Sequence, residues 1–124
     1  MSEMQTYHSG ASRSDATTKL SYLRGLSVQV LTRYMEYLQA NRALPDGSLR
    51  DFDNWKKGQP TDRYKDSLYR HTHDAIRKSI GLSVPEDASL EDLLCAVIFN
   101  ASGWLFELLV AKSGNREEVA KCGS

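Results

Sequence analysis

Apolar side chains recur at the three- and four-residue spacing of an amphipathic helix along two segments of the chain. The first segment covers residues 27–43 and is followed by the turn-forming residues 45–47. The second starts at residue 61 or 62, after a proline, and ends near Gly81. The pattern predicts two helices. The inward side of the second helix should carry Tyr64, Leu68, His71 and Ala75, with Ile76 and Ile80 beside them.

A third segment, residues 93–111, is apolar almost all round and belongs to a predicted helix that ends near residue 112. Ser89, followed three residues later by Asp92, resembles a capping box and predicts the start of a helix. A helix of this kind lies at the centre of a fold, in an oligomer interface or in a membrane. Asn100 and Glu107 interrupt the run, and the rest of the chain is polar in character. We therefore expect a water-soluble protein and no membrane partner.

The three segments predict an all-α fold, a small bundle of about three long helices with an ordered loop. Two neighbours cannot cover every side of the apolar third helix, so we expect a homodimer or a higher homo-oligomer. Residues 1–18 are rich in Ser, Thr, Gly and Asp and predict a flexible arm. A single helical domain should follow over residues 19–112, and a disordered tail over residues 113–124.

Composition narrows the classes of function. Sixteen basic residues balance sixteen acidic ones, so the net charge gives no reason to expect binding of bulk nucleic acid or anionic lipid. Cys95 and Cys122 lie far apart without metal-ligand spacing, which favours reduced thiols. The N-terminal residues form no apolar signal segment. We expect a cytoplasmic protein in which any anion site is local.

The loop between the first two helices carries candidate chemistry. Residues 46–60 combine turn formers with Phe52 and Trp55, and Lys56 and Lys57 follow the tryptophan directly. An indole offers a stacking face to a base, and lysines neutralise phosphate. The same residues also fit a tryptophan that packs at the edge of the core beside solvated lysines.

Polar residues also lie on the inward sides of the predicted helices. On the second helix, His71 follows Arg70 and lies one turn before Asp74. It is either a core histidine with a hydrogen-bonded partner or a ligand for phosphate, base or metal. On the third helix, a stripe of small and polar residues either lets another helix approach closely or lines a pocket. This stripe contains Asp92, Ala96, Asn100, Gly103 and Glu107.

The order of these motifs resembles a known family. Asn54-Trp55-x-Lys57-Gly58 is followed by Arg63-Tyr64, Asp66-Ser67 and Arg70-His71, and then by Glu91-Asp92 at the start of an apolar helix containing Asn100. With the upstream segment SGASRSDATTKL, the set spans roughly residues 9–110. It is similar to the phage and prophage family called dATP/dGTP diphosphohydrolase N-terminal domain.

The resemblance implies a phage protein that acts in the host cytoplasm as a Mg²⁺-dependent pyrophosphohydrolase of purine (deoxy)nucleoside triphosphates. In such a reaction carboxylates hold the metal, and basic side chains face the phosphates. The implied catalytic residues are Asp92, Glu91 and His71; the implied nucleotide-binding residues are Trp55, Lys57, Arg63, Arg70 and Asn100; and the implied metal ligands are Glu91, Asp92 and Glu107.

An alternative is a protein that binds a nucleotide without catalysis and sequesters it, for example a host immune signal. All-α nucleotide pyrophosphatases use paired ExxE and ExxD spacings, and neither occurs at the matching positions here. Leu93 also stands where many relatives of the family carry a histidine. Both features favour the alternative. A third hypothesis is a structural or partner-binding helical bundle.

Overall fold

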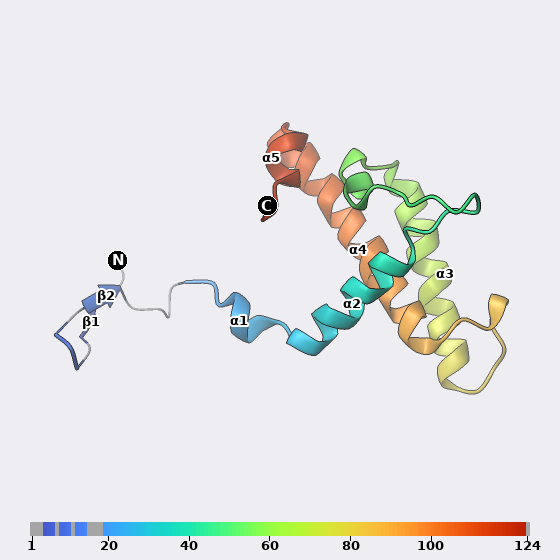
Figure 1. Cartoon of the computed structure of the whole chain (residues 1–124), viewed down its shortest axis with the longest axis horizontal. Coiled ribbons are helices and arrows are strands. Elements are labelled where there is room, and N and C mark those ends of the chain that lie inside the picture. The colour runs from blue at the N-terminus through green and yellow to red at the C-terminus, as the bar shows by residue number, and fades with distance from the viewer. Residues whose placement is uncertain (1–3, 7, 11, 15–18, 124) are drawn as a thin grey trace. The chain divides into compact units, whose positions relative to one another are not determined.

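The computed structural model describes residues 4–6, 8–10, 12–14 and 19–123. It is mostly helical, which confirms the all-α character of the predicted fold (Figure 1). The chain divides into two compact units between Arg33 and Tyr34, inside helix α2 (Val28–Ala40). The sequence had placed the start of the helical domain at residue 19 instead.

The first unit contains a short hairpin that the sequence did not predict. Strands β1 (Met4–Thr6) and β2 (Ser12–Ser14) pair antiparallel, with Met4 opposite Ser14. Gly10, in the connection, has a φ of 88°, a left-handed conformation that suits a hairpin turn. The rest of the expected flexible arm, residues 1–3, 7, 11 and 15–18, lies outside the described residues. Helix α1 (Tyr22–Gly25) and the start of α2 complete this unit.

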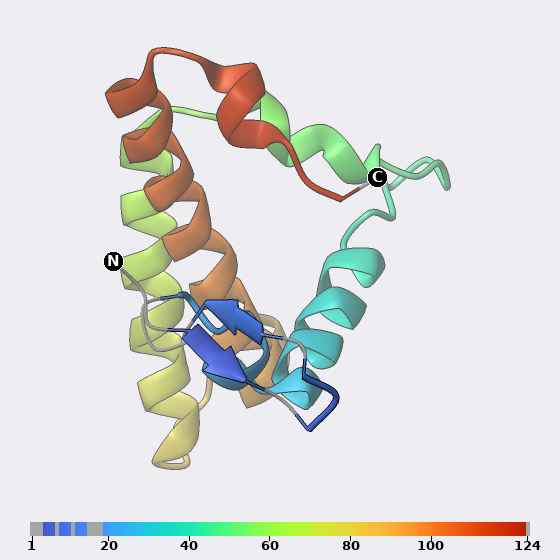
Figure 2. The ribbon, with the colours of Figure 1, turned by 90° about the vertical axis from the view of Figure 1, so that its left-hand side faces the viewer.

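The second unit is built on helices α3 (Thr61–Ser79) and α4 (Leu90–Ser113), which lie side by side (Figures 1 and 2). The ends of these two helices agree with the second and third predicted helices to within about two residues. Ser89 caps α4 as expected, because its Oγ accepts the backbone N–H of Asp92 at 3.1 Å. Two short 3₁₀ helices, η2 (Phe52–Lys57) and η3 (Pro85–Asp87), lie in the connections.

Helix α3 packs tightly against α4 at Gly103, through the side chain of Tyr64. A Cβ atom at this position would overlap the ring of Tyr64, whose residue is only 2% exposed. The same ring meets Phe99 edge-on, with ring centroids 6.4 Å apart. Ala96 and Asn100 are also buried on α4. The small and polar stripe of α4 therefore allows close helix packing, which was one of its two interpretations.

The C-terminal half of α2 meets α4 through two tyrosines. A hydrogen bond joins the Tyr34 side chain to Ser102, while burial, followed by nearby Tyr37, raises the pKa of Tyr34 to about 12. Burial and the Asp92 carboxylate also raise the pKa of Tyr37. The two rings are stacked, with centroids 6.5 Å apart. These contacts place the C-terminal half of α2 next to α4.

The expectation of a disordered tail after residue 112 is wrong for helix α5 (Arg116–Ala120). Gly114 ends α4 in a left-handed conformation, and the side chain of Asn115 then caps α5 by accepting the N–H of Glu118 at 3.1 Å. Ala120 is 7% exposed. Asn115 and Glu118 have the spacing of a capping box, a signal that the sequence analysis passed over.

Few large apolar side chains of the second unit are fully buried. Ile76 and Ile80, expected beside the inward side of α3, are 58% and 68% exposed. In α4, only 28% of the most apolar 18-residue window is buried, and by length and composition alone this helix could cross a membrane. The stability of the unit must therefore depend strongly on the few tight contacts between α3 and α4.

We predict that Gly103→Ala destabilises the protein. At an exposed helix position this change would stabilise by roughly 1 kcal/mol. Here the added methyl group meets the Tyr64 ring, and overpacking of this kind costs about 1–3 kcal/mol. Chemical denaturation should therefore give a lower free energy of unfolding. Ala111→Gly, at an exposed position of the same helix, measures the propensity effect alone, and a more stable Gly103→Ala variant would contradict the packing.

Candidate nucleotide site

A cavity of about 520 Å³ opens in the second unit between the end of α2, the following loop with η2, and helices α3 and α4. Its volume is within the range of small-molecule sites. Its lining is rich in amide and aromatic side chains. The residues from α2 and the loop are Tyr37, Leu38, Asn41, Arg42, Arg50, Asp51, Phe52, Asn54, Trp55, Gly58 and Gln59; those from α3 and α4 are Tyr64, Ser67, His71, Phe99 and Asn100.

The loop is ordered around two aromatic residues, as the sequence predicts. Trp55 meets Phe106 of α4 edge-on, with ring centroids 5.3 Å apart, so it is anchored against the core while it lines the cavity. Phe52 is 41% exposed, and the Arg42 guanidinium lies 5.8 Å from its ring centroid. Nε of Arg42 also donates to the carbonyl of Arg50 at 2.8 Å. Trp55 therefore packs at the edge of the core and also lines the cavity, while its stacking on a base stays a prediction.

Asn100 and His71 line the cavity from the two packed helices. Asn100 is 6% exposed, and its amide donates to the carbonyl of Ala96, one turn earlier in α4, at 2.8 Å. Nδ1 of His71 is buried and has no hydrogen-bond partner among the described residues. Burial, followed by the charge of Arg70, lowers the pKa of His71, and Asp74 opposes this effect. A neutral imidazole at pH 7 follows, with a ring nitrogen that a ligand could satisfy.

A second hollow, of about 210 Å³, adjoins the cavity because both are lined by Gln59 and Ser67. Arg63 and Arg70 line this second hollow, so these two predicted binding residues lie beside the main cavity rather than in it. Nη2 of Arg70 donates to Oγ of Ser67 at 3.3 Å. Lys57 lines neither space. Of the three basic residues predicted to bind the nucleotide, two therefore line the adjoining hollow and Lys57 lines neither space.

The predicted Mg²⁺ ligands are not brought together within one chain. Glu91 and Asp92 lie in the first turn of α4, and Glu107 lies about four turns further on, roughly 22 Å away along the axis. In the part of the chain that the structure describes, no three His, Cys, Asp or Glu residues are close enough to hold a metal ion. A shared helix face had suggested a common site, but residues on one face can still lie at opposite ends of a helix.

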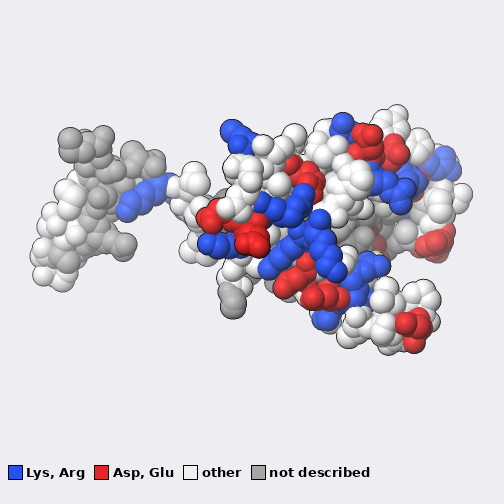
Figure 3. Space-filling view, turned by 90° about the horizontal axis from the view of Figure 1, so that it is seen from above, with Lys and Arg blue, Asp and Glu red and all other residues white. Residues whose placement is uncertain are grey.

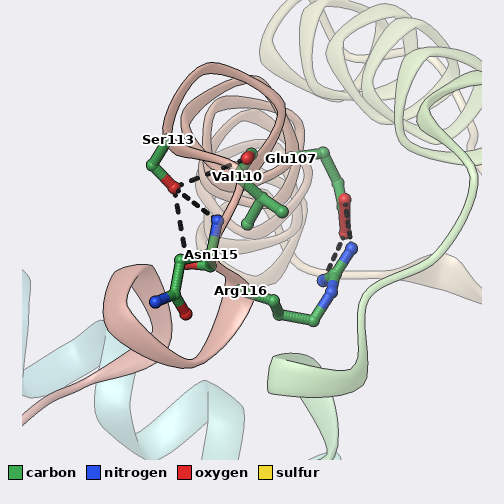
Figure 4. Close-up of polar contacts among 5 residues, drawn as sticks. All are labelled: Glu107, Val110, Ser113, Asn115 and Arg116. Carbon is green, nitrogen blue, oxygen red and sulfur yellow. Dashed lines mark hydrogen bonds and ion pairs between the residues drawn. The ribbon is translucent and has the colours of Figure 1, made fainter.

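Glu107 has a structural partner instead (Figure 4). Its two carboxylate oxygens accept hydrogen bonds of 2.9 and 2.8 Å from the guanidinium of Arg116 in α5. The Glu107 side chain is 11% exposed. The hydrogen bonds from Arg116 outweigh burial and hold the pKa of Glu107 below its ordinary value. Gly58, with a φ of 75°, packs so closely on this ion pair that a Cβ atom there would overlap both side chains.

The ion pair therefore fixes the end of η2 against α4 and α5, and η2 carries two aromatic residues of the cavity. On the face seen in Figure 3, basic side chains of the helical part lie beside acidic ones. This agrees with the balanced composition. Arginines that line the cavity and its adjoining hollow are the basic groups placed to attract an anion there.

Sequence reasoning missed several cavity residues that lie outside regular periodicity. Arg42 and Arg50 come together because the chain reverses between them, with Ala43 and Leu49 forming an isolated antiparallel bridge. The turn-forming residues 45–47 signalled this reversal, but not which side chains would face inward. Comparisons with protein-family models, curated proteins and solved structures found no match for this chain. The family resemblance therefore remains an expectation based on motifs.

We predict that Glu107→Gln destabilises the protein in a pH-dependent way. Because the folded pKa of Glu107 is lowered, its contribution is complete above the ordinary value of 4.5 and is lost as the pH falls through the lowered value. The difference in unfolding free energy between the wild type and Glu107→Gln should shrink over that acidic window.

Denaturation between pH 3 and pH 7 measures this difference. Glu118→Gln removes an exposed ion pair with Lys121 and should have little effect. A destabilisation by Glu107→Gln that persists unchanged at the lowest pH would contradict the role of the ionised carboxylate.

Proposed function

We propose that this chain binds a nucleotide in the cavity between η2, α3 and α4. The observation that carries the proposal is the combination of side chains around one space of about 520 Å³. Aromatic rings offer stacking faces to a base, and side-chain amides offer donors and acceptors to its edge. Inside the fold, the Asn100 amide and Nδ1 of His71, which has no hydrogen-bond partner among the described residues, are two polar groups that can bind the edge of a base.

The phosphates of this nucleotide would extend toward the adjoining hollow. Arg63 and Arg70 line that hollow, and the two spaces meet at Gln59 and Ser67. Guanidinium groups bind phosphate through paired hydrogen bonds and stay charged at neutral pH. Asp66 lies in the same hollow, so a phosphate also has to avoid one carboxylate.

Binding without hydrolysis is the form that the geometry supports better. A Mg²⁺ centre does not fit the residues named for it, because Glu107 is held by Arg116 at the opposite end of α4 from Asp92. The ordered motifs that resemble the diphosphohydrolase family are the observation that favours hydrolysis. In that case ligands for the metal must come from more than one chain.

We predict that ATP, dATP, GTP or dGTP quenches the fluorescence of Trp55. The chain has two tryptophans, so Trp104→Phe leaves Trp55 as the single reporter. In this background, the double change Arg63→Gln and Arg70→Gln should raise the dissociation constant about tenfold or more, since a charged hydrogen bond contributes roughly 1.5–3 kcal/mol. Lys121→Gln, outside both spaces, is the matched control and should leave the affinity unchanged.

The same samples, with Mg²⁺ added, are assayed for release of pyrophosphate. Quenching without release is the expected result. If the wild type releases pyrophosphate and Asp92→Ala does not, the function is hydrolysis of the nucleotide and not binding alone. If none of the four nucleotides or a panel of cyclic signalling nucleotides binds, the proposal fails, and a structural or partner-binding role takes its place.

A further inference from the structure

The face of α4 that points away from α3 carries a continuous apolar stripe. We call it the outer stripe, and its members are Leu94, Ile98, Ala101, Leu105, Leu108 and Leu109. The first five follow the alternating four- and three-residue spacing of a coiled-coil seam. The four leucines are 44–56% exposed, so the second unit leaves the stripe largely uncovered. Burying such residues is worth about 1.5–3 kcal/mol each when complete.

The outer stripe is separate from the packed side of α4. Residues that pack against α3, such as Ala96, Asn100 and Gly103, lie about half a turn around the helix from it. The stripe therefore contributes nothing to the cavity or to the α3–α4 contact. Its residue spacing is that of a surface that pairs with another helix.

We propose that the outer stripe binds the same stripe of a second copy of this chain, with the two α4 helices antiparallel. The charges at the two ends of the stripe favour the antiparallel over the parallel arrangement. Glu91 precedes the stripe, and Lys112 follows it on the same face. An antiparallel pair places each glutamate near the lysine of the other copy, whereas a parallel pair places like charges together.

One register brings the outer stripe of each copy against that of the other. When Ala101 lies at the two-fold axis, it faces Ala101 of the other copy, Leu94 falls opposite Leu108, and Ile98 lies within one residue of being opposite Leu105. The small residue at the centre permits close approach of the two backbones. Each contact away from the axis occurs twice, as the symmetry of a homodimer requires. The stripe is thus complementary to itself, a property that neither a lipid surface nor an unrelated partner would require.

Light scattering and sedimentation of the full chain test the proposal. A dimer is expected, and Leu105→Glu should weaken it at least tenfold, because it places a charge in the middle of the stripe. Tyr69→Glu, on α3, changes a residue that is 79% exposed and outside the stripe, and should leave the dimer intact. A wild-type monomer at all concentrations overturns the proposal, as does equal weakening by both variants.

Charge exchange tests the antiparallel arrangement. Glu91→Lys and Lys112→Glu should each weaken the dimer, and together they should restore it. If each single change weakens the dimer and the double change does not restore it, antiparallel pairing is contradicted. Sedimentation with lipid vesicles tests whether the stripe binds a membrane instead. If the wild type sediments with the vesicles and Leu105→Glu does so less, the stripe is a membrane-binding surface and the dimer proposal fails. None of these measurements needs a nucleotide, so their outcome is distinguishable from that of the binding proposal.

Discussion

The contact of the Tyr64 ring with the backbone of α4 at Gly103 is the constraint on which the second unit depends. It brings α3 close to α4 at one point, near the N-terminus of α3, and buries the largest side chain of the core. Because few other residues of the unit are fully buried, the spacing of the two helices is decided largely here. A larger residue at position 103 would separate the helices and change every element that rests on both.

The cavity is a consequence of that spacing. η2 reaches across the end of the helix pair, and Gly58 must approach the Glu107–Arg116 ion pair without a side chain of its own. Trp55 is then held against Phe106, which leaves room between the loop and the helices. A residue chosen for catalysis by its type, Glu107, acts here as a structural anchor. The same anchor orders α5, the segment that composition alone had assigned to a tail.

Local signals predicted the helices well and the site only in part. The boundaries of α3 and α4 follow from a proline, a capping serine and apolar periodicity, all of which act within a few residues. The stripe through Ala96, Asn100 and Gly103 predicted a special face of α4 for the same reason. Distances along a helix and the path of a loop are different, because they depend on contacts between distant residues. For that reason the metal ligands were grouped wrongly, and Arg42 and Arg50 were not recognised.

Helix α4 has two faces with opposite requirements, and this explains its uniformly apolar composition. The face toward α3 needs small residues at Ala96 and Gly103, which bury little surface of their own. The opposite face is rich in leucine yet stays exposed within the second unit. A helix that only served the core would carry its large residues inward and polar residues outward. Exposed leucines opposite a packed face are expected when the same helix packs against one neighbour and, as proposed above, pairs with a second copy.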